Sequence, residues 1–139
     1  MSEPLHQQTV LVTGATDGIG KGTARELARH GARVLLHGRD IERAAAARDE
    51  IAAATGNTRL ETYVGDFASL RDVHRLAEQV TARHDRLHVL INNAGIGAGP
   101  RGRQRREVSA DGYELRLQVN HLAPLLLAHL LLPLLRAGA

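Results

Sequence analysis

The sequence has no cysteine and is poor in aromatic residues, with Tyr63, Phe67 and Tyr113 as its three. Without cysteine the chain cannot form a disulfide scaffold, a thiolate nucleophile or a zinc site with sulfur ligands. Three aromatic side chains are too few for the stacking platforms with which proteins bind single-stranded nucleic acid. The 139 residues are 43% hydrophobic and 24% charged, which is typical of one soluble globular domain and not of a disordered chain.

Long apolar runs are also few. The longest, Leu122 to Leu135, contains His129 and two prolines and falls short of the ~20 residues that span a bilayer. We therefore expect a buried helix or an interface there, and no membrane span. The segment 1–8 is polar and has no secretory signal, which predicts a cytoplasmic protein. The eight histidines form no H-x-x-x-H pair on a helix, so we expect no metal site.

Strand-like and helix-like segments alternate along the chain, separated by turn residues. The strand-like segments are Gln8 to Thr13, Arg33 to His37, Leu60 to Val64 and Leu87 to Asn92. The helical segments are Gly18 to His30, 41–55 after the N-cap Asp40, the segment after the capping box Ser69-x-x-Asp72, and Asp111 to Leu135. The last strand is apolar enough to be buried on both faces. Four such βα units predict an α/β, Rossmann-type doubly wound parallel sheet with strand order 3-2-1-4, forming one domain over residues 1–139.

A glycine-rich turn, Thr13-Gly14-Ala15-Thr16-Asp17-Gly18-Ile19-Gly20, joins the first strand to the first helix. Glycines there remove the Cβ atoms that would hold a pyrophosphate away from backbone N–H groups, and the helix N-terminus faces the anion. A tight turn with positive φ angles would explain the same glycines without any ligand. The position of the turn between a strand and a helix favours phosphate binding.

The spacing T-G-x-x-x-G-x-G, together with Asn92-Asn93-Ala94-Gly95 at the end of the fourth strand, resembles the short-chain dehydrogenase/reductase family. Gly65-Asp66 after the third strand adds to this similarity. The stretch Asp111-Gly112-Tyr113-Glu114-Leu115, which leads to Val119-Asn120-His121-Leu122, resembles the retinol-dehydrogenase-like branch. The resemblance runs from Thr9 to Leu135 and covers the N-terminal part of the family's domain. It implies an NAD(P)-dependent oxidoreductase that transfers hydride between its cofactor and a small carbonyl or alcohol substrate.

The resemblance also assigns cofactor-binding roles at the carboxyl ends of the strands. The implied pyrophosphate loop consists of Gly14, Gly18, Ile19 and Gly20. Asp66 would bind the adenine amino group, and Phe67 would give a backbone contact to the ring. Asn93, Ala94 and Gly95 would line the ribose of the adenosine and brace the sheet. For Asp66 and Asn93, a carboxylate or amide that merely satisfies a turn is the alternative.

Asn120 is the catalytic residue that the resemblance implies for this chain, where it would help to hold a water in the proton relay. A polar residue at a helix kink is the alternative. Pro124 has no N–H, so the carbonyl of Asn120, four residues earlier, loses its helical partner. That carbonyl is then an acceptor for such a water.

The choice of cofactor depends on Arg39 and Asp40 at the end of the second strand. An acid there binds the ribose hydroxyls of NAD, whereas an arginine accepts the 2′-phosphate of NADP. Asp40 is also placed to cap a helix, and Arg39 resembles the residue that selects NADP in many family members, so we expect NADP rather than NAD. Asp17 argues against NADP, because some NADP-using family members have a basic residue at its position.

The family's catalytic serine and Tyr-x-x-x-Lys are absent from these residues. The resemblance therefore implies the cofactor-binding half of the enzyme, truncated before the fifth strand. Two alternatives stay open: a non-catalytic dinucleotide-binding or interaction module that pairs through its fourth strand and last helix, and a nucleic-acid binder that uses the arginine cluster 101–106. A charge run in a loop is usually solvated, so we expect no nucleic-acid partner. The apolar last helix leads us to expect self-association.

Overall fold

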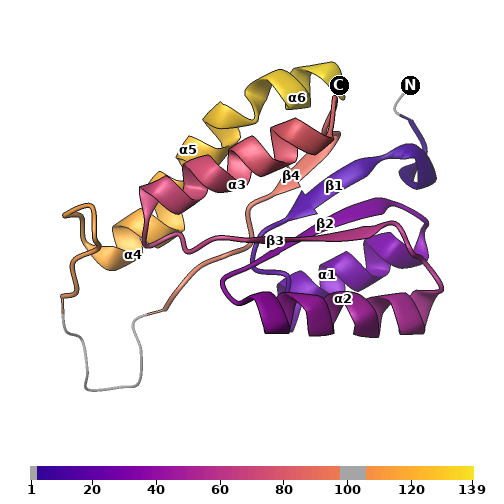
Figure 1. Cartoon of the computed structure of the whole chain (residues 1–139), viewed down its shortest axis with the longest axis horizontal. Coiled ribbons are helices and arrows are strands. Elements are labelled where there is room, and N and C mark those ends of the chain that lie inside the picture. The colour runs from indigo at the N-terminus through magenta and orange to yellow at the C-terminus, as the bar shows by residue number, and fades with distance from the viewer. Residues whose placement is uncertain (1–2, 98–105) are drawn as a thin grey trace.

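The fold is a parallel β-sheet with helices on both faces, as seen in a computed structural model of the chain (Figure 1). The structure describes residues 3–97 and 106–139. Its strands are β1 Thr9–Val12, β2 Arg33–Gly38, β3 Leu60–Val64 and β4 Val89–Ile91. All pairings are parallel and the order is β3-β2-β1-β4. The predicted Rossmann-type order 3-2-1-4 is therefore confirmed.

The helices divide between the two faces of the sheet (Figure 1). One face carries α1 Gly18–Arg29 and α2 Ile41–Thr55, and the other carries α3 Leu70–Arg83, α5 Ala123–Leu130 and α6 Leu132–Ala137; a short 3-10 helix, η1 Leu5–Gln7, precedes β1. Each face has its own apolar core because alternate residues of a strand point to opposite sides. In β1, Val10 and Val12 pack in the cluster with α1 and α2, whereas Leu11 packs in the cluster with α3 and α5.

Side-chain caps start both α2 and α3. Asp40 accepts the N–H of Arg43 at 2.8 Å and begins α2, as predicted. Ser69 Oγ accepts the N–H of Asp72 at 3.4 Å and begins α3. The reciprocal half of the predicted capping box is wrong, because the N–H of Ser69 donates to the carbonyl of Asp66. The Asp72 carboxylate accepts the N–H of Asp66 at 3.0 Å, which ties the loop after β3 to α3.

The fourth strand is shorter and more exposed than predicted. The expected strand from Leu87 to Asn92, buried on both faces, is wrong, because β4 comprises Val89–Ile91 and Val89 is 37% exposed. Among the described residues β4 pairs with β1 alone, so it lies at an edge of the sheet. Leu87 is buried, but its N–H donates to the carbonyl of Leu134 in α6 at 3.0 Å.

The last helical segment starts later than the predicted Asp111. Gly112 has a φ of 86°, a left-handed conformation through which an α-helix does not run. Helical structure begins with the short α4 Leu115–Leu117, and the Glu114 side chain caps it by accepting the N–H of Leu117 at 2.9 Å.

This segment is also interrupted, so the prediction of one continuous helix to Leu135 is wrong. A π-helical turn, η2 Gln118–Leu122, separates α4 from α5, and within it the N–H of Ala123 donates to the carbonyl of Gln118. Pro124 lacks the N–H that an α-helix would give to the carbonyl of Asn120, and this loss favours the wider turn. Pro133 lies in the first turn of α6 and marks the second break. No helix in residues 3–97 and 106–139 has the length and apolar character needed to cross a membrane.

Candidate functional site

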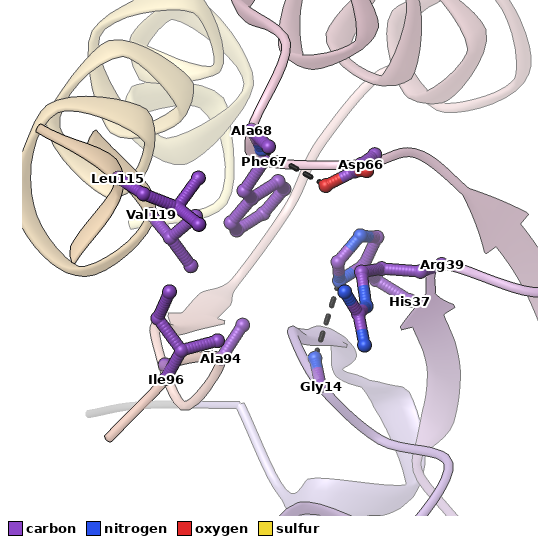
Figure 2. A pocket seen from close by; sticks show the side chains of 11 residues that line it. Gly14, His37, Arg39, Asp66, Phe67, Ala68, Ala94, Ile96, Leu115 and Val119 are labelled. Atoms are coloured by element: carbon purple, nitrogen blue, oxygen red, sulfur yellow. Dashed lines mark hydrogen bonds between the residues drawn. The ribbon is translucent and has the colours of Figure 1, made fainter. Parts of the chain in front are cut away.

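A cavity of about 180 Å³ lies at the carboxyl ends of the strands (Figure 2). The predicted site residues that line it are Gly14, Arg39, Asp66, Phe67, Ala94 and Gly95. They follow four different strands and are brought together because the carboxyl ends of parallel strands meet at one edge of the sheet. Apolar side chains from the segment after β4 and from the last helical segment complete the wall, among them Ile96, Leu115 and Val119.

The other predicted residues of the glycine turn lie outside the lining of this cavity. Asp17, Gly18 and Ile19 are exposed at the N-terminus of α1, and Ile19 is 82% exposed. Gly14 and Gly18 have φ angles of 62° and 54°, so each adopts the left-handed conformation that favours glycine. A Cβ added at Gly18 would meet no atom within 4 Å, which leaves the first turn of α1 open to an approaching ligand.

Gly20, predicted as part of the pyrophosphate loop, is closely packed within that loop. It is buried, and a Cβ there would collide with the carbonyl oxygen of Gly14 and the side-chain amide of Asn93. Its lack of a side chain therefore serves the close packing of α1 against the turn and the segment after β4.

Asn93 and Thr13 tie the glycine turn to the end of β4. The Asn93 side-chain amide donates to the carbonyls of Thr13 at 3.0 Å and Gly14 at 3.1 Å. In return, Thr13 Oγ1 accepts the N–H groups of Asn93 and Ala94, both at 3.0 Å. Thr13 is buried and links both segments, a role that its place at the start of the glycine-rich motif did not reveal.

Asp17 is engaged within the chain. One carboxylate oxygen accepts the N–H of Gly18 at 2.7 Å and so caps α1. The other lies 3.7 Å from a guanidinium nitrogen of Arg43 in the first turn of α2. Both side chains are mostly exposed, so the pair contributes little to stability, but the arginine offsets the negative charge beside the glycine turn.

Arg39 and Asp40 have separate positions. Arg39 is exposed and lines the cavity, with its guanidinium drawn close to the glycine turn in Figure 2. The carboxylate of Asp40 is occupied as the N-cap of α2.

The loop after β3 is held from two sides. Asp66 Oδ1 accepts the N–H of Ala68 at 2.9 Å, which fixes the carboxylate beside the cavity (Figure 2). The carbonyl of Phe67 accepts a hydrogen bond from the buried Gln118 of η2 at 3.1 Å. The Gln118 amide also donates to the Asp111 carboxylate at 2.9 Å, so the last helical segment holds this loop in place. The sequence analysis missed Gln118, because its contact with Phe67 joins segments that are 51 residues apart in sequence.

The sequence analysis also missed His37. It is 2% exposed, lines the cavity, and stacks on Phe67 with ring centroids 4.5 Å apart and planes 12° apart. Its Nδ1 accepts the N–H of Gly14 at 3.2 Å, and its Nε2 lies 2.8 Å from the carbonyl oxygen of Gly65. Burial lowers its pKa from the ordinary value, although the Gly65 hydrogen bond and the charge of Asp66 oppose this. One available signal was its position in a buried strand two residues before Arg39, which places both side chains on one face.

Asn120 lies at the π-helical turn and faces the segment after β4. Its Oδ1 accepts the N–H of Ile96 at 2.8 Å, and its Nδ2 donates to the carbonyl of Ile96 at 2.9 Å. The side chain thus pairs with the backbone of Ile96 and fixes one wall of the cavity. Of the arginine cluster 101–106, residues 101–105 lie outside the described residues.

Comparison with known proteins identifies a family for the chain. The model of the short chain dehydrogenase family matches residues 8–139. Retinol dehydrogenase 12 of Bos taurus is 43% identical over 135 residues, which are 97% of this chain and 41% of that protein. Dehydrogenase/reductase SDR family member 13 of Homo sapiens is 44% identical over 135 residues, or 97% of this chain and 34% of that protein. The chain thus spans well under half the length of these relatives.

Solved structures give the same result. RhlG of Pseudomonas aeruginosa, in an active-site complex with NADP, superposes with a TM-score of 0.81 at 31% identity, over 99% of this chain and 52% of that one. A metagenomic short-chain oxidoreductase in complex with NADP gives a TM-score of 0.77 at 36% identity, over 94% of this chain and 57% of that one. With the sheet order and the cavity at its carboxyl edge, these matches show that the chain belongs to the short-chain dehydrogenase family.

Proposed function

We propose that the chain forms the dinucleotide-binding part of an NADP-dependent oxidoreductase that interconverts a carbonyl and a hydroxyl group on a small molecule. The observation that carries this proposal is the meeting of four strand ends at one cavity, with the open N-terminus of α1 beside it. Ligands of open α/β sheets bind at this edge, where the strand order reverses between β1 and β4.

The residues present fit a dinucleotide. The exposed first turn of α1 offers backbone N–H groups and the positive end of the helix dipole to a pyrophosphate, and Gly18 leaves the approach clear. The cavity has apolar walls and one carboxylate, Asp66, which suits a flat base with an amino group. NADP complexes of RhlG and of the metagenomic oxidoreductase support the same class of ligand.

Within this proposal each group has a task of binding or positioning. Gly14 and Gly18 let the backbone turn closely, and Asn93 holds that turn against the end of β4. Asp66 receives the amino group, and Asn120 fixes the cavity wall at Ile96. A bound nicotinamide supplies hydride chemistry, and the protein supplies orientation. The names of the relatives, retinol dehydrogenases among them, support an alcohol or carbonyl substrate.

Arg39 supports NADP over NAD. Arg39 is exposed and is the arginine among the described residues that line the cavity, whereas the Asp40 carboxylate caps α2. Asp17 adds a negative charge nearby, but its contact with Arg43 offsets that charge. The charges beside the expected 2′-phosphate therefore favour an anion.

The test is a fluorescence titration of the folded chain with NADPH and NADH. Replacing Arg39 with alanine removes charge-assisted hydrogen bonds of ~1.5–3 kcal/mol, so NADPH affinity should fall by roughly 10- to 100-fold while NADH affinity changes little. Arg29→Ala is the matched control, because Arg29 lies in the last turn of α1, at the opposite end of the helix, and pairs with Glu26. If Arg39→Ala loses affinity for NADPH and NADH equally, Arg39 has a structural role. If the variant keeps the parent's preference between the two nucleotides, Asp40 and not Arg39 sets that preference.

A further inference from the structure

The imidazole of His37 joins the two loops that flank the cavity. Its Nδ1 accepts the N–H of Gly14, and the carbonyl of the same residue accepts the N–H of Ala15 at 2.8 Å. Two consecutive amides of the glycine turn are therefore bound to one residue of β2. On the other side of the ring, Nε2 bonds to the carbonyl of Gly65 in the loop after β3.

These contacts fix the tautomer of the ring. The carbonyl of Gly65 can only accept, so Nε2 must carry the hydrogen. The N–H of Gly14 can only donate, so Nδ1 must be bare. Both hydrogen bonds form together in the neutral Nε2–H tautomer and in no other state. Burial, which lowers the pKa of His37, favours this neutral state.

The ring also supports Phe67. The two rings are stacked, and both line the cavity (Figure 2). His37 therefore contacts, at once, the turn expected to bind the pyrophosphate and the loop expected to bind the adenine. A shift of the ring would change the distance between those two loops.

We propose that His37 is a positioning residue for dinucleotide binding, whose neutral ring holds the glycine turn and the Gly65–Phe67 loop at the spacing that the ligand needs. This inference rests on the proposed function and deepens it. The residue needs no contact with the ligand, because it acts through Gly14 and Phe67.

At low pH, protonation of the His37 ring is expected to weaken dinucleotide binding. A proton on Nδ1 would face the N–H of Gly14, so a hydrogen bond would become a contact between two donors. Of the charged groups that line the cavity with His37, Asp66 would attract the imidazolium and Arg39 would repel it. Asp66 is already engaged with Ala68, and within residues 3–97 and 106–139 the N–H of Gly14 has Nδ1 as its acceptor, so we expect dinucleotide affinity to fall as the pH falls.

The ordinary pKa of histidine is about 6.5, and that of buried His37 is lower. Affinity should therefore be full above about pH 6.5 and decline as the pH falls through the lowered value.

The experiment compares three forms of the chain by fluorescence titration with NADPH and NADH, from about pH 8 to about pH 5.5. His37→Ala removes both ring contacts and should weaken binding of both nucleotides by roughly 10-fold or more at about pH 8. His37→Asn keeps an acceptor oxygen where Nδ1 lies but cannot be protonated. It should retain more affinity than His37→Ala and show a flatter pH profile than the parent.

Two controls isolate the ring. NADH lacks the 2′-phosphate, which itself gains a proton near a pKa of about 6, so its profile reports the protein alone. His74→Asn makes the same substitution at an exposed position of α3 and should leave the profile of the parent unchanged. In the ligand-free parent, the NMR signal of the Gly14 amide should titrate together with the His37 ring. That measurement does not depend on the folding of His37→Ala.

The outcomes separate the two claims. If the parent binds neither nucleotide at about pH 8, the proposed function is wrong and this inference falls with it. If the parent binds but His37→Ala binds equally well, or if parent and His37→Asn share one NADH profile, the inference alone is overturned. Affinity that rises on acidification would also overturn it, since that result would mean the imidazolium attracts the ligand instead of disturbing the turn.

Discussion

Gly20 offers the most direct test of how the glycine turn is held. A Cβ at this buried position in the first turn of α1 would collide with the carbonyl oxygen of Gly14 and the amide of Asn93. Gly22, two residues later in the same helix, has no atom within 4 Å of the place where its Cβ would lie. The methyl group of an alanine would therefore collide with its surroundings at position 20 and have free space at position 22.

The two substitutions should change stability in opposite directions. Gly22→Ala should raise the free energy of unfolding by ~0.5–1 kcal/mol, because alanine is the better helix former. Gly20→Ala has the same advantage, but it forces overpacking worth ~1–3 kcal/mol and displaces the Asn93–Gly14 hydrogen bond, worth ~0.5–1.5 kcal/mol. The net result is a loss of about 0.5–4 kcal/mol, so the two variants should differ by about 1.5–4.5 kcal/mol, the sum of the overpacking and the lost hydrogen bond.

Urea unfolding followed by far-ultraviolet circular dichroism measures this difference, with all variants at one protein concentration. The Gly20 variant should unfold at a lower urea concentration than the parent, and the Gly22 variant at a higher one, with similar slopes. NADPH titration of the folded proteins should show weaker binding for Gly20→Ala, because displacement of Gly14 moves the turn. A Gly20→Ala protein as stable as the parent would refute the close-packing argument, since the collision predicts a loss whatever the ligand.

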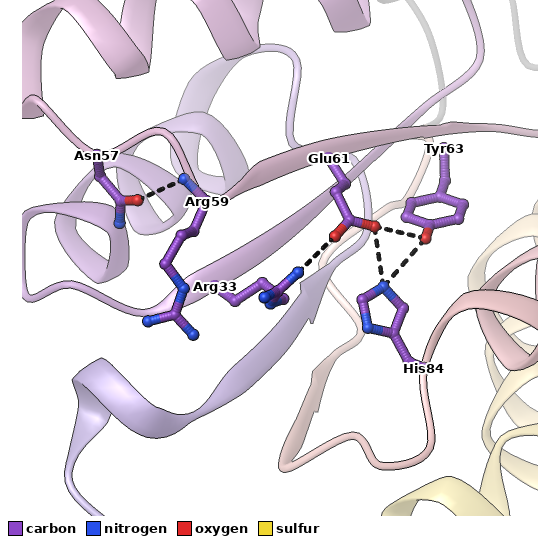
Figure 3. A network of polar contacts seen from close by, with 6 residues as sticks. All are labelled: Arg33, Asn57, Arg59, Glu61, Tyr63 and His84. Carbon is purple, nitrogen blue, oxygen red and sulfur yellow. Dashed lines mark hydrogen bonds and ion pairs between the residues drawn. The ribbon is translucent and has the colours of Figure 1, made fainter.

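Three further predictions concern other parts of the chain. Although burial alone would raise it, hydrogen bonds from His84 and Tyr63 hold the pKa of Glu61 below its ordinary value (Figure 3). The contribution of Glu61 to stability should be full above about pH 4.3 and lost as the pH falls through the lowered pKa. In urea unfolding, the free energy of unfolding of Glu61→Gln should therefore fall less between about pH 6 and about pH 3.5 than that of the parent or of the exposed control Glu78→Gln. Leu125 is 61% exposed, so we expect the chain to self-associate. Sedimentation at tens of micromolar, on the order of a normal assay, should show species larger than the monomer, and Leu125→Glu should reduce the amount of those species. No Tyr-x-x-x-Lys occurs in the 139 residues, so we expect no NADPH oxidation with aldehydes or ketones, and turnover would show that another group transfers the proton.

Much of the fold was predictable from local patterns. The third strand was predicted with the bounds it has in the structure, Leu60–Val64, because β-branched and aromatic residues between turn residues define it locally. The cap Asp40 was also predicted, since such caps depend on residues within one turn of the helix. The fourth strand and its place beside the first were predicted too, but its bounds and its burial were not, because these depend on which strands pair with it. Leu87 looked like part of that strand but contacts the last helix.

Some residues of the candidate site could likewise be predicted from the sequence, and others could not. Glycines and acidic residues at strand ends could be found in sequence, because the chemistry they serve restricts both residue type and position. Gly20 shows the limit of that reasoning, since spacing could not tell a glycine that faces a ligand from one that packs against Asn93. His37 shows another limit, because a buried histidine has no local signature that distinguishes a core residue from one that bonds to two loops.

The π-helical turn explains why the prediction of one continuous last helix is wrong. Gln118 reaches the carbonyl of Phe67 in the loop after β3, while Asn120 pairs with Ile96 after β4. Residues two apart in a helix do not share a face, so each side chain reaches a different loop. Pro124 removes the N–H that would continue the α-helical pattern at Asn120, and η2 begins at Gln118. A single wide turn thus connects both walls of the cavity to the last helical segment.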